Sequence, residues 1–179
     1  MLIALYIVLG VLGIITIVIP LFLPSKAHLE RSIEINANQQ KIFETLSSFK
    51  NWENWSPWQE KDPEMKHSYL GVPGQVGHSF SWEGHPKKVG KGMLRIIEVK
   101  PYSLLKTELQ FGKNPNFSPC AFILKANDNT TVNITWTFDA DFGYKLPARY
   151  FGLLMEKFLG PDYEKGLENL KNYCEKINP

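Results

Sequence analysis

The first two dozen residues of this chain carry no charged side chain, and this feature most limits what the chain can fold into. All 20 Lys and Arg residues and all 18 Asp and Glu residues follow residue 24. The run from Leu2 to Leu23 is apolar on every side, whereas a buried core helix would show a polar stripe. As a helix this run would be roughly 33 Å long, which matches the hydrocarbon thickness of a bilayer. We therefore predict a transmembrane anchor over residues 1–24.

Two details bear on how this anchor ends. Pro20 lies inside the apolar run, so we expect the helix to kink there or to stop near Ile19. Ser25-Lys26-Ala27 resembles a small-x-small cleavage site, which leaves a cleaved signal peptide as the alternative. An uncleaved anchor is favoured, because no basic region precedes the run and the run is longer than the apolar part of a usual signal peptide.

The basic residues near the anchor predict its orientation. Lys26 and Arg31 follow the apolar run and no basic side chain precedes it, so the positive-inside rule places the following domain on the cytoplasmic side. Cys120 and Cys174 are too few for a disulfide framework or, alone, for a structural zinc site, and they agree with a reducing compartment. The sequence thus predicts a single-pass membrane protein with a cytoplasmic domain.

The remaining residues, 25–179, have the size and composition of one globular domain. The net charge of +2 excludes a nucleic-acid-binding protein that works mainly through bulk charge, so we expect no nucleic-acid partner. Apolar residues make up 44% of the chain and aromatic residues 13%, which excludes a disordered segment.

The spacing of apolar residues in this domain predicts one strand, two short helices, about six more strands and a long terminal helix. The first helix is expected over Gln39–Leu46 with Asn38 as its N-cap. The alternation of apolar and polar residues predicts strands at His28–Ile35, Lys66–Leu70, His78–Glu83, Val89–Val99, Leu104–Phe111, Cys120–Ala126 and Thr131–Phe138.

The end of the chain predicts the helix that covers this sheet. An apolar stripe repeats at helical spacing through Tyr163, Leu167, Leu170, Cys174 and Ile177. The Gly160-Pro161 pair before it indicates either two helices or one long kinked helix. An antiparallel sheet must cover one face, and this is the only long helix available to do so. The expected fold is therefore α+β, a curved antiparallel sheet of about six to seven strands around a long C-terminal helix. Such an arrangement can leave a cavity between sheet and helix.

This order of elements resembles the helix-grip superfamily, also called SRPBCC, of START lipid-transfer domains, Bet v 1-like allergens and polyketide cyclase-like proteins. Local matches accompany the order of elements at Ile33–Ala37, Trp55–Trp58, Asp62-Pro63, Gly90–Gly92 and Gly166–Lys171. The resemblance covers about Ala27 to Ile177 and is strongest to bacterial members with one N-terminal membrane helix. It implies a helix-grip domain over residues 25–179 at the bacterial inner membrane. These matches are scaffold positions and assign no chemistry.

The sequence shows no catalytic constellation, metal site or cofactor motif. No nucleophile elbow, phosphate-binding loop or dinucleotide fingerprint is present. His78 and His85 flank a hairpin without other ligands at a recognisable spacing, which favours exposed histidines at strand ends. Asp139 and Asp141 share one strand face, where solvated acids are the commoner explanation.

Large apolar side chains are the candidates for a ligand site. We expect nine of them to line the cavity or its rim: Trp52, Trp55, Trp58, Trp82, Phe122, Trp136, Phe138, Leu154 and Phe158. The alternative for the tryptophans is ordinary core packing, since aromatic residues dominate core energetics. Trp52, Trp55 and Trp58 could also form a hydrophobic patch that rests on the bilayer.

Three functions fit these features. The favoured one is a membrane-anchored, non-enzymatic binding module for an apolar small molecule or lipid. The second is a regulatory module with a filled core and a protein partner. The third is a cyclase- or hydratase-type enzyme, for which Arg31, Glu83 and Arg95 are the inward polar candidates.

Overall fold

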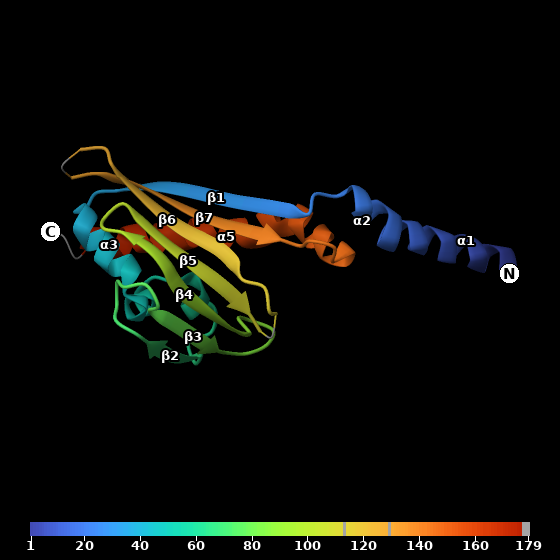
Figure 1. Ribbon diagram of the computed structural model, residues 1–179, viewed down its shortest axis with the longest axis horizontal. Helices are drawn as coiled ribbons and strands as arrows, with labels where there is room; N and C mark the ends of the chain where they lie inside the picture. Colours follow the sequence, from blue (N-terminus) through green and yellow to red (C-terminus); the bar gives the residue numbers. More distant parts are fainter. Residues whose placement is uncertain (113, 129, 177–179) are drawn as a thin grey trace.

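A curved antiparallel sheet packs one face against a long C-terminal helix, α5 (Leu146–Lys176), in the computed structural model (Figure 1). The structure describes residues 1–112, 114–128 and 130–176. Within these ranges the sheet has seven strands in the order β1-β7-β6-β5-β4-β3-β2. The strands are β1 (Lys26–Ile35), β2 (Lys66–Leu70), β3 (Ser79–Glu83), β4 (Lys91–Lys100), β5 (Leu104–Phe111), β6 (Ser118–Ala126) and β7 (Val132–Asp141). The predicted α+β fold is confirmed.

The sheet is a meander from β2 to β7 that β1 extends by pairing with β7. Ile33 lies opposite Ile134 in this last pair, and all neighbouring strands are antiparallel. The strands form where apolar and polar residues alternate, because alternate side chains point to opposite faces of a sheet. In β7 the inward residues Ile134, Trp136 and Phe138 are buried, as the sequence pattern predicts.

Three short helical segments connect β1 to β2: α3 (Gln39–Ser47), a 3-10 helix η2 (Phe49–Asn54) and α4 (Pro57–Lys61). Asn38 caps α3, since its side-chain oxygen accepts hydrogen bonds from the backbone N–H groups of Gln40 (2.9 Å) and Lys41 (3.3 Å). α4 begins with Pro57, whose missing N–H would have no helical partner at that position. The predicted first helix and its N-cap are therefore confirmed.

The terminal helix α5 runs unbroken through Gly160 and Pro161, so the chain has one long helix here rather than two. Pro161 lies on the exposed side of the helix, where water can satisfy the carbonyl group that the proline leaves free. The buried stripe of α5 comprises Met155, Tyr163, Leu167, Leu170 and Cys174. Ile177, the last residue of the predicted stripe, lies outside the described residues.

The apolar N-terminal run forms a helix that projects away from the sheet (Figure 1). It consists of α1 (Leu2–Gly13), a π-helical turn η1 (Ile14–Val18) and α2 (Ile19–Phe22). The wide turn lies just before Pro20, whose ring would clash with the carbonyl group four residues earlier in a regular helix. Among the described residues, this 21-residue helix alone is long and apolar enough to cross a membrane, with a mean hydropathy of 3.0.

Hydrogen bonds from the start of α5 hold the end of this helix. Arg149 Nη1 donates to the carbonyl oxygens of Pro20 and Leu23, each at 3.1 Å, and the Tyr150 hydroxyl donates to the carbonyl oxygen of Ile15. The last carbonyl groups of a helix have no partner within it, so the guanidinium group supplies one. These bonds fix the apolar helix beside the first turns of α5.

An ion cluster joins α5 to the edge strand β1. Arg31 contacts Glu156 at 2.6 Å and Glu164 at 2.8 Å, and its side chain is only 27% exposed. Gly160 leaves room for this side chain, since a Cβ atom there would lie 2.7 Å from Arg31 Nη2. The hydrogen bond from Arg31 holds the pKa of Glu156 below its ordinary value. Arg31 therefore fastens the helix to the sheet and does not face the interior as a free polar group.

We expect Arg31→Met to lower the melting temperature at pH 7 by a few degrees, because surface ion pairs contribute little. A carboxyl group with a lowered pKa stabilises the fold above its unfolded-state pKa, about 4.3 for Glu, and loses this contribution as the pH falls. The difference in melting temperature between the wild type and Arg31→Met should thus decrease from pH 6 to pH 3. Lys91→Met, which removes an exposed partner 3.7 Å from Glu83, is the control. A gap that stays constant down to pH 3 would contradict this role of Arg31.

Candidate functional site

A cavity of about 260 Å³ lies between the inner face of the sheet, α5 and the short helices η2 and α4. Its walls are mostly aromatic, and the aromatic residues that line it are Phe49, Trp52, Trp58, Tyr69, Phe80, Trp82, Phe111, Trp136 and Tyr163. Leu94, Leu109 and Leu159 add aliphatic surface. A concave, mainly apolar hollow with a few polar groups is typical of a small-molecule site.

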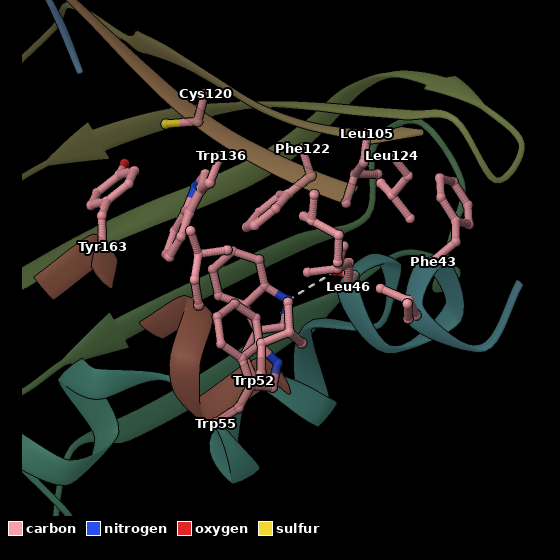
Figure 2. Close-up of a cluster of buried hydrophobic side chains, with 14 of the residues drawn as sticks. Phe43, Leu46, Trp52, Trp55, Leu105, Cys120, Phe122, Leu124, Trp136 and Tyr163 are labelled. Carbon is pink, nitrogen blue, oxygen red and sulfur yellow. Dashed lines mark hydrogen bonds between the residues drawn. The ribbon is translucent and has the colours of Figure 1, made fainter. Parts of the chain in front are cut away.

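Trp136 forms the centre of this aromatic wall. Its ring stacks on Tyr163 from α5, with centroids 4.1 Å apart, and on Phe122 from β6, with centroids 4.7 Å apart (Figure 2). Gly166 allows α5 to come this close, because a Cβ atom at Gly166 would lie 2.9 Å from Trp136 Cζ3. A missing side chain on the helix therefore makes room for the indole ring between helix and sheet.

Trp82 forms the wall at the other side and also depends on a glycine. Its strand position pairs with Gly92 of β4, where a Cβ atom would lie 2.5 Å from Trp82 Cζ2. The Trp82 indole N–H donates to the carbonyl oxygen of Val89 at 3.1 Å, which fixes the ring across the inner face of the sheet. Gly92, one of the two glycines of the Gly90–Gly92 segment, thus has a direct structural role beside the cavity.

The structure divides the nine predicted site residues into three groups. Trp52, Trp58, Trp82 and Trp136 line the cavity. Trp55, Phe122 and Phe138 are buried, with exposed fractions of 1%, 0% and 4%, but pack in the solid core behind the cavity wall. Figure 2 shows Trp55 beside Trp52 and Phe122 beside Trp136 in this core.

Leu154 and Phe158 are not among the residues that line the cavity. Their side chains are 44% and 55% exposed. Each helical residue turns the side chain by about 100°, and the inward positions are the ones that follow them, Met155 and Leu159. The sequence contains adjacent apolar residues at both places, so periodicity alone does not distinguish the inward member of each pair.

A polar cluster from two separate segments enters this apolar cavity. Glu53 Oε1 accepts a hydrogen bond from the Tyr69 hydroxyl at 2.6 Å and lies 3.2 Å from His67 Nδ1. The bonds from Tyr69 and His67 hold the pKa of Glu53 below its ordinary value, whereas burial and the contact with Glu53 raise that of Tyr69. All three side chains line the cavity.

Three buried polar atoms at the cavity have no hydrogen-bond partner among the described residues: Gln59 Oε1, His67 Nε2 and Thr107 Oγ1. A buried polar atom without a partner costs about 1–3 kcal/mol, so these atoms are suited to a polar group of a bound molecule. None of the three residues belongs to the predicted site. The signal was the alternation in β2, where His67 and Tyr69 alternate with exposed Lys66 and Ser68.

The histidines beside the predicted hairpin differ from each other. His78 is 3% exposed, so the expectation of an exposed strand-end residue is wrong for it. Its ring stacks on Phe49, and its Nδ1 lies 3.0 Å from the carbonyl oxygen of Leu70, which satisfies the buried imidazole. His85 is exposed, as expected.

The polar residues proposed for an enzyme lie away from the cavity. Arg31 binds Glu156 and Glu164 of α5, as described above. Glu83 and Arg95 lie on the outer face of the sheet, where Arg95 pairs with Glu108. Their positions supply no acid/base pair inside the domain.

The end of the sheet nearest the apolar helix contributes residues to the cavity wall. β1 begins at that end, and because the strands are antiparallel, β5 ends there and the turn between β3 and β4 lies there (Figure 1). Phe111 and Lys88 from these segments line the cavity. An ion pair between Lys61 and Asp162, 2.6 Å apart, joins α4 to α5 at the same cavity. Part of the cavity wall and the apolar helix are therefore at the same end of the domain.

The two cysteines are buried, and burial disfavours their reactive thiolate forms. Burial raises the pKa of Cys120 to about 12 and that of Cys174 to about 11. Only the thiolate reacts, and an unperturbed thiol has a pKa of about 8.5.

We therefore expect Cys120 of the folded protein to react with a disulfide reagent at pH 8 more than about a thousandfold more slowly than in the unfolded chain. The measurement is the rate of thiol release with Ellman's reagent in mild detergent, and the same protein in guanidinium chloride is the control. Rapid labelling of both cysteines in the folded protein would contradict the buried core described here.

Comparisons with known proteins place this fold. No curated protein matches the sequence significantly. The Zhui aromatase/cyclase of Streptomyces sp. R1128 is 11% identical with a TM-score of 0.65, over 84% of this chain and 94% of that chain. Norcoclaurine synthase of Thalictrum flavum, in complex with dopamine and hydroxybenzaldehyde, is 12% identical with a TM-score of 0.67, over 91% and 94%. The Aha1 dimer of Colwellia psychrerythraea is 15% identical with a TM-score of 0.60, over 86% and 99%.

These identities establish a shared fold and no shared activity. The family comparison extends over most of the chain and confirms the resemblance to the polyketide cyclase-like, helix-grip superfamily. Residues 26–175 match the sequence profile of a family described as "Polyketide cyclase / dehydrase and lipid transport", so the chain belongs to this family.

Proposed function

We propose that this protein is a membrane-anchored binding module that holds a hydrophobic small molecule between the sheet and α5. The cavity carries this proposal, because aromatic side chains from strands, short helices and α5 converge on one hollow. A regulatory module with a filled core, the alternative function, would lack such a cavity. The family's description, which includes lipid transport, agrees with a hydrophobic ligand.

The size of the cavity limits the ligand. A cavity of about 150 Å³ lined by apolar residues holds benzene, and sites for drug-sized molecules start at about 300 Å³. A volume of about 260 Å³ therefore suits a molecule of one to three rings or a short chain, and is too small for a complete two-chain lipid. Norcoclaurine synthase, which shares the fold, was solved with single-ring molecules, dopamine and hydroxybenzaldehyde.

The N-terminal helix supports the membrane part of the proposal. Its 21 residues have the length and hydropathy of a membrane span, and its most apolar stretch is not buried against the domain. Domain boundaries at residues 1–24 and 25–179, a bacterial inner-membrane location and a cytoplasmic orientation belong to the same proposal.

The start of α5 adds apolar surface next to this helix. Phe151, Leu154 and Phe158 are each more than 40% exposed, and the rings of Phe151 and Phe158 stack with centroids 6.4 Å apart. Tyr150 of the same helix segment reaches the carbonyl oxygen of Ile15 inside the apolar helix. A bilayer that surrounds the apolar helix would thus meet this stripe, which ends one residue before Leu159 at the cavity. This arrangement would give a hydrophobic ligand a short path between the bilayer and the cavity.

Filling the cavity tests the proposal. We expect the wild-type protein in mild detergent to bind 2-naphthol, a two-ring probe, in equilibrium dialysis. Leu109→Trp places an indole ring at the cavity wall and should weaken binding at least about tenfold, because this ring occupies space that the ligand needs. Ser68→Trp adds the same side chain at an exposed outward position of β2 and should bind like the wild type. Equal binding by all three proteins, or none by the wild type, would contradict the proposal.

A further inference from the structure

The unpartnered polar atoms at the cavity indicate which chemical group its ligand carries. A ligand group inferred from these atoms rests on the proposed binding function and makes that function more specific. The neighbouring residues determine, for two of the three atoms, whether the atom donates or accepts a hydrogen bond.

Glu53 determines the proton position on His67. The hydrogen bond from Tyr69 and the contact with His67 keep the pKa of Glu53 low, so this carboxylate is ionised at neutral pH and can only accept hydrogen bonds. His67 Nδ1, 3.2 Å from Glu53 Oε1, must therefore carry the proton of the neutral imidazole. In the neutral ring, the other ring nitrogen, Nε2, then holds a lone pair and is an acceptor.

The imidazole ring is held in this position by its neighbours. The side chain of His67 is 12% exposed, and its ring contacts the edges of Phe80 and Tyr69 at centroid distances of 5.3 and 6.1 Å. Its Nε2 is buried at the cavity with no partner among the described residues. A fixed, buried acceptor therefore belongs to the cavity wall.

Gln59 supplies a second acceptor by the same reasoning. Its side-chain Nε2 donates to the carbonyl oxygen of Pro63 at 3.3 Å, so its Oε1 is the atom that remains free. Oε1 is buried, and Gln59 lines the cavity. The two atoms whose character the structure determines are thus both acceptors, and the Thr107 hydroxyl can adopt either role.

We propose that the cavity selects a flat apolar molecule with a hydroxyl or N–H group, and that His67 Nε2 accepts a hydrogen bond from this group. A ligand without a donor would leave the His67 acceptor buried and unpaired. Glu53 acts as a positioning residue, because its carboxylate sets the tautomer of His67.

The test compares 2-naphthol with 2-methoxynaphthalene, which has nearly the same ring system but no donor. We expect wild-type protein in mild detergent to bind 2-naphthol about tenfold more tightly in equilibrium dialysis, the effect of one buried hydrogen bond. His67→Phe keeps a ring in place but has no acceptor, and it should bind both probes with equal affinity. Equal affinities in the wild type, or a preference for 2-naphthol that persists in His67→Phe, would overturn the role of His67.

The same titrations separate this inference from the binding proposal. If both probes bind the wild type equally and Leu109→Trp weakens both, the cavity binds apolar molecules and the selection by His67 is wrong. If neither probe binds, both proposals fail.

A spectroscopic measurement tests the positioning role of Glu53 without a ligand. The ¹⁵N chemical shifts of the His67 imidazole should show a protonated Nδ1 and an unprotonated Nε2 in the neutral ring. In Glu53→Gln the side-chain amide can donate to Nδ1, so the fraction of the Nε2-protonated tautomer should rise and the preference for 2-naphthol should fall. A wild-type spectrum with the proton on Nε2 would overturn the assignment of an acceptor to the cavity.

Discussion

Trp136→Ala is expected to lower the free energy of unfolding by about 3–5 kcal/mol, the usual cost of removing a large buried aromatic side chain. Trp136 is 3% exposed, and its ring packs against rings from the sheet, α4 and α5. The centroid distances are 4.7 Å to Phe122, 5.7 Å to Trp58 and 4.1 Å to Tyr163. Alanine would join the space of the indole ring to the existing cavity, so sheet and α5 would lose much of their contact at this point. This side chain connects the stability of the fold to the shape of the site.

The measurement is equilibrium unfolding in guanidinium chloride and mild detergent. Unfolding is followed by far-UV circular dichroism, because the loss of Trp136 changes the tryptophan fluorescence itself. Phe158→Ala is the matched control, since it removes an aromatic ring that is 55% exposed on α5. We expect this control to change the free energy of unfolding by less than about 0.5 kcal/mol in the absence of a bilayer. A loss below about 1 kcal/mol for Trp136→Ala would contradict the packing of Trp136 between sheet and helix.

Removal of residues 2–23 is expected to transfer nearly all of the protein from the membrane fraction to the soluble fraction. The deleted helix has a mean hydropathy of 3.0 over its most apolar window, whereas the stripe of Phe151, Leu154 and Phe158 alone gives only a weak interfacial attachment. The measurement is the distribution between pellet and supernatant after an alkaline carbonate wash. Thr16→Leu, which makes the helix more apolar, should remain in the pellet as the control.

The mass of the membrane-bound protein then separates an anchor from a cleaved signal peptide. An uncleaved anchor gives the mass of the full chain, with or without the initiator methionine. A soluble full-length protein would contradict the proposed anchor, and a product that begins near Ser25 would show that the apolar helix is a signal peptide.

Much of the fold can be predicted from local patterns because its elements are themselves local. Val132, Ile134, Trp136 and Phe138 alternate with polar residues and form β7, and Asn38 caps the first helix of the domain as predicted. The β2-to-β7 meander follows from successive hairpins, each with a short connection. The pairing of β1 with β7 joins residues about a hundred positions apart, so local patterns do not predict it.

The site is less accessible from the sequence because it depends on which residues of distant segments meet. Glu53 comes from a 3-10 helix, and His67 and Tyr69 come from an edge strand, so no spacing rule joins them. The choice between Phe158 and Leu159 depends on the exact rotation of α5, which a run of adjacent apolar residues leaves open.

The unbroken helix at Pro161 and the buried position of His78 have a common physical cause. Pro161 can remain within one helix because it faces water, and His78 can be buried because Leu70 and Phe49 supply partners for its ring nitrogens. Each outcome depends on the tertiary surroundings of the residue, which residue type alone does not report.

Native mass spectrometry of the full chain, released from mild detergent, tests the central claim most directly, because it asks whether the hollow between sheet and α5 holds a molecule. We predict a wild-type species with one bound small molecule, whose mass suits a cavity of about 260 Å³, and the same adduct on Ser68→Trp. The adduct should be absent or strongly reduced on Leu109→Trp. An adduct of equal occupancy on all three proteins, or a wild-type protein that stays empty even after incubation with 2-naphthol, would contradict the account.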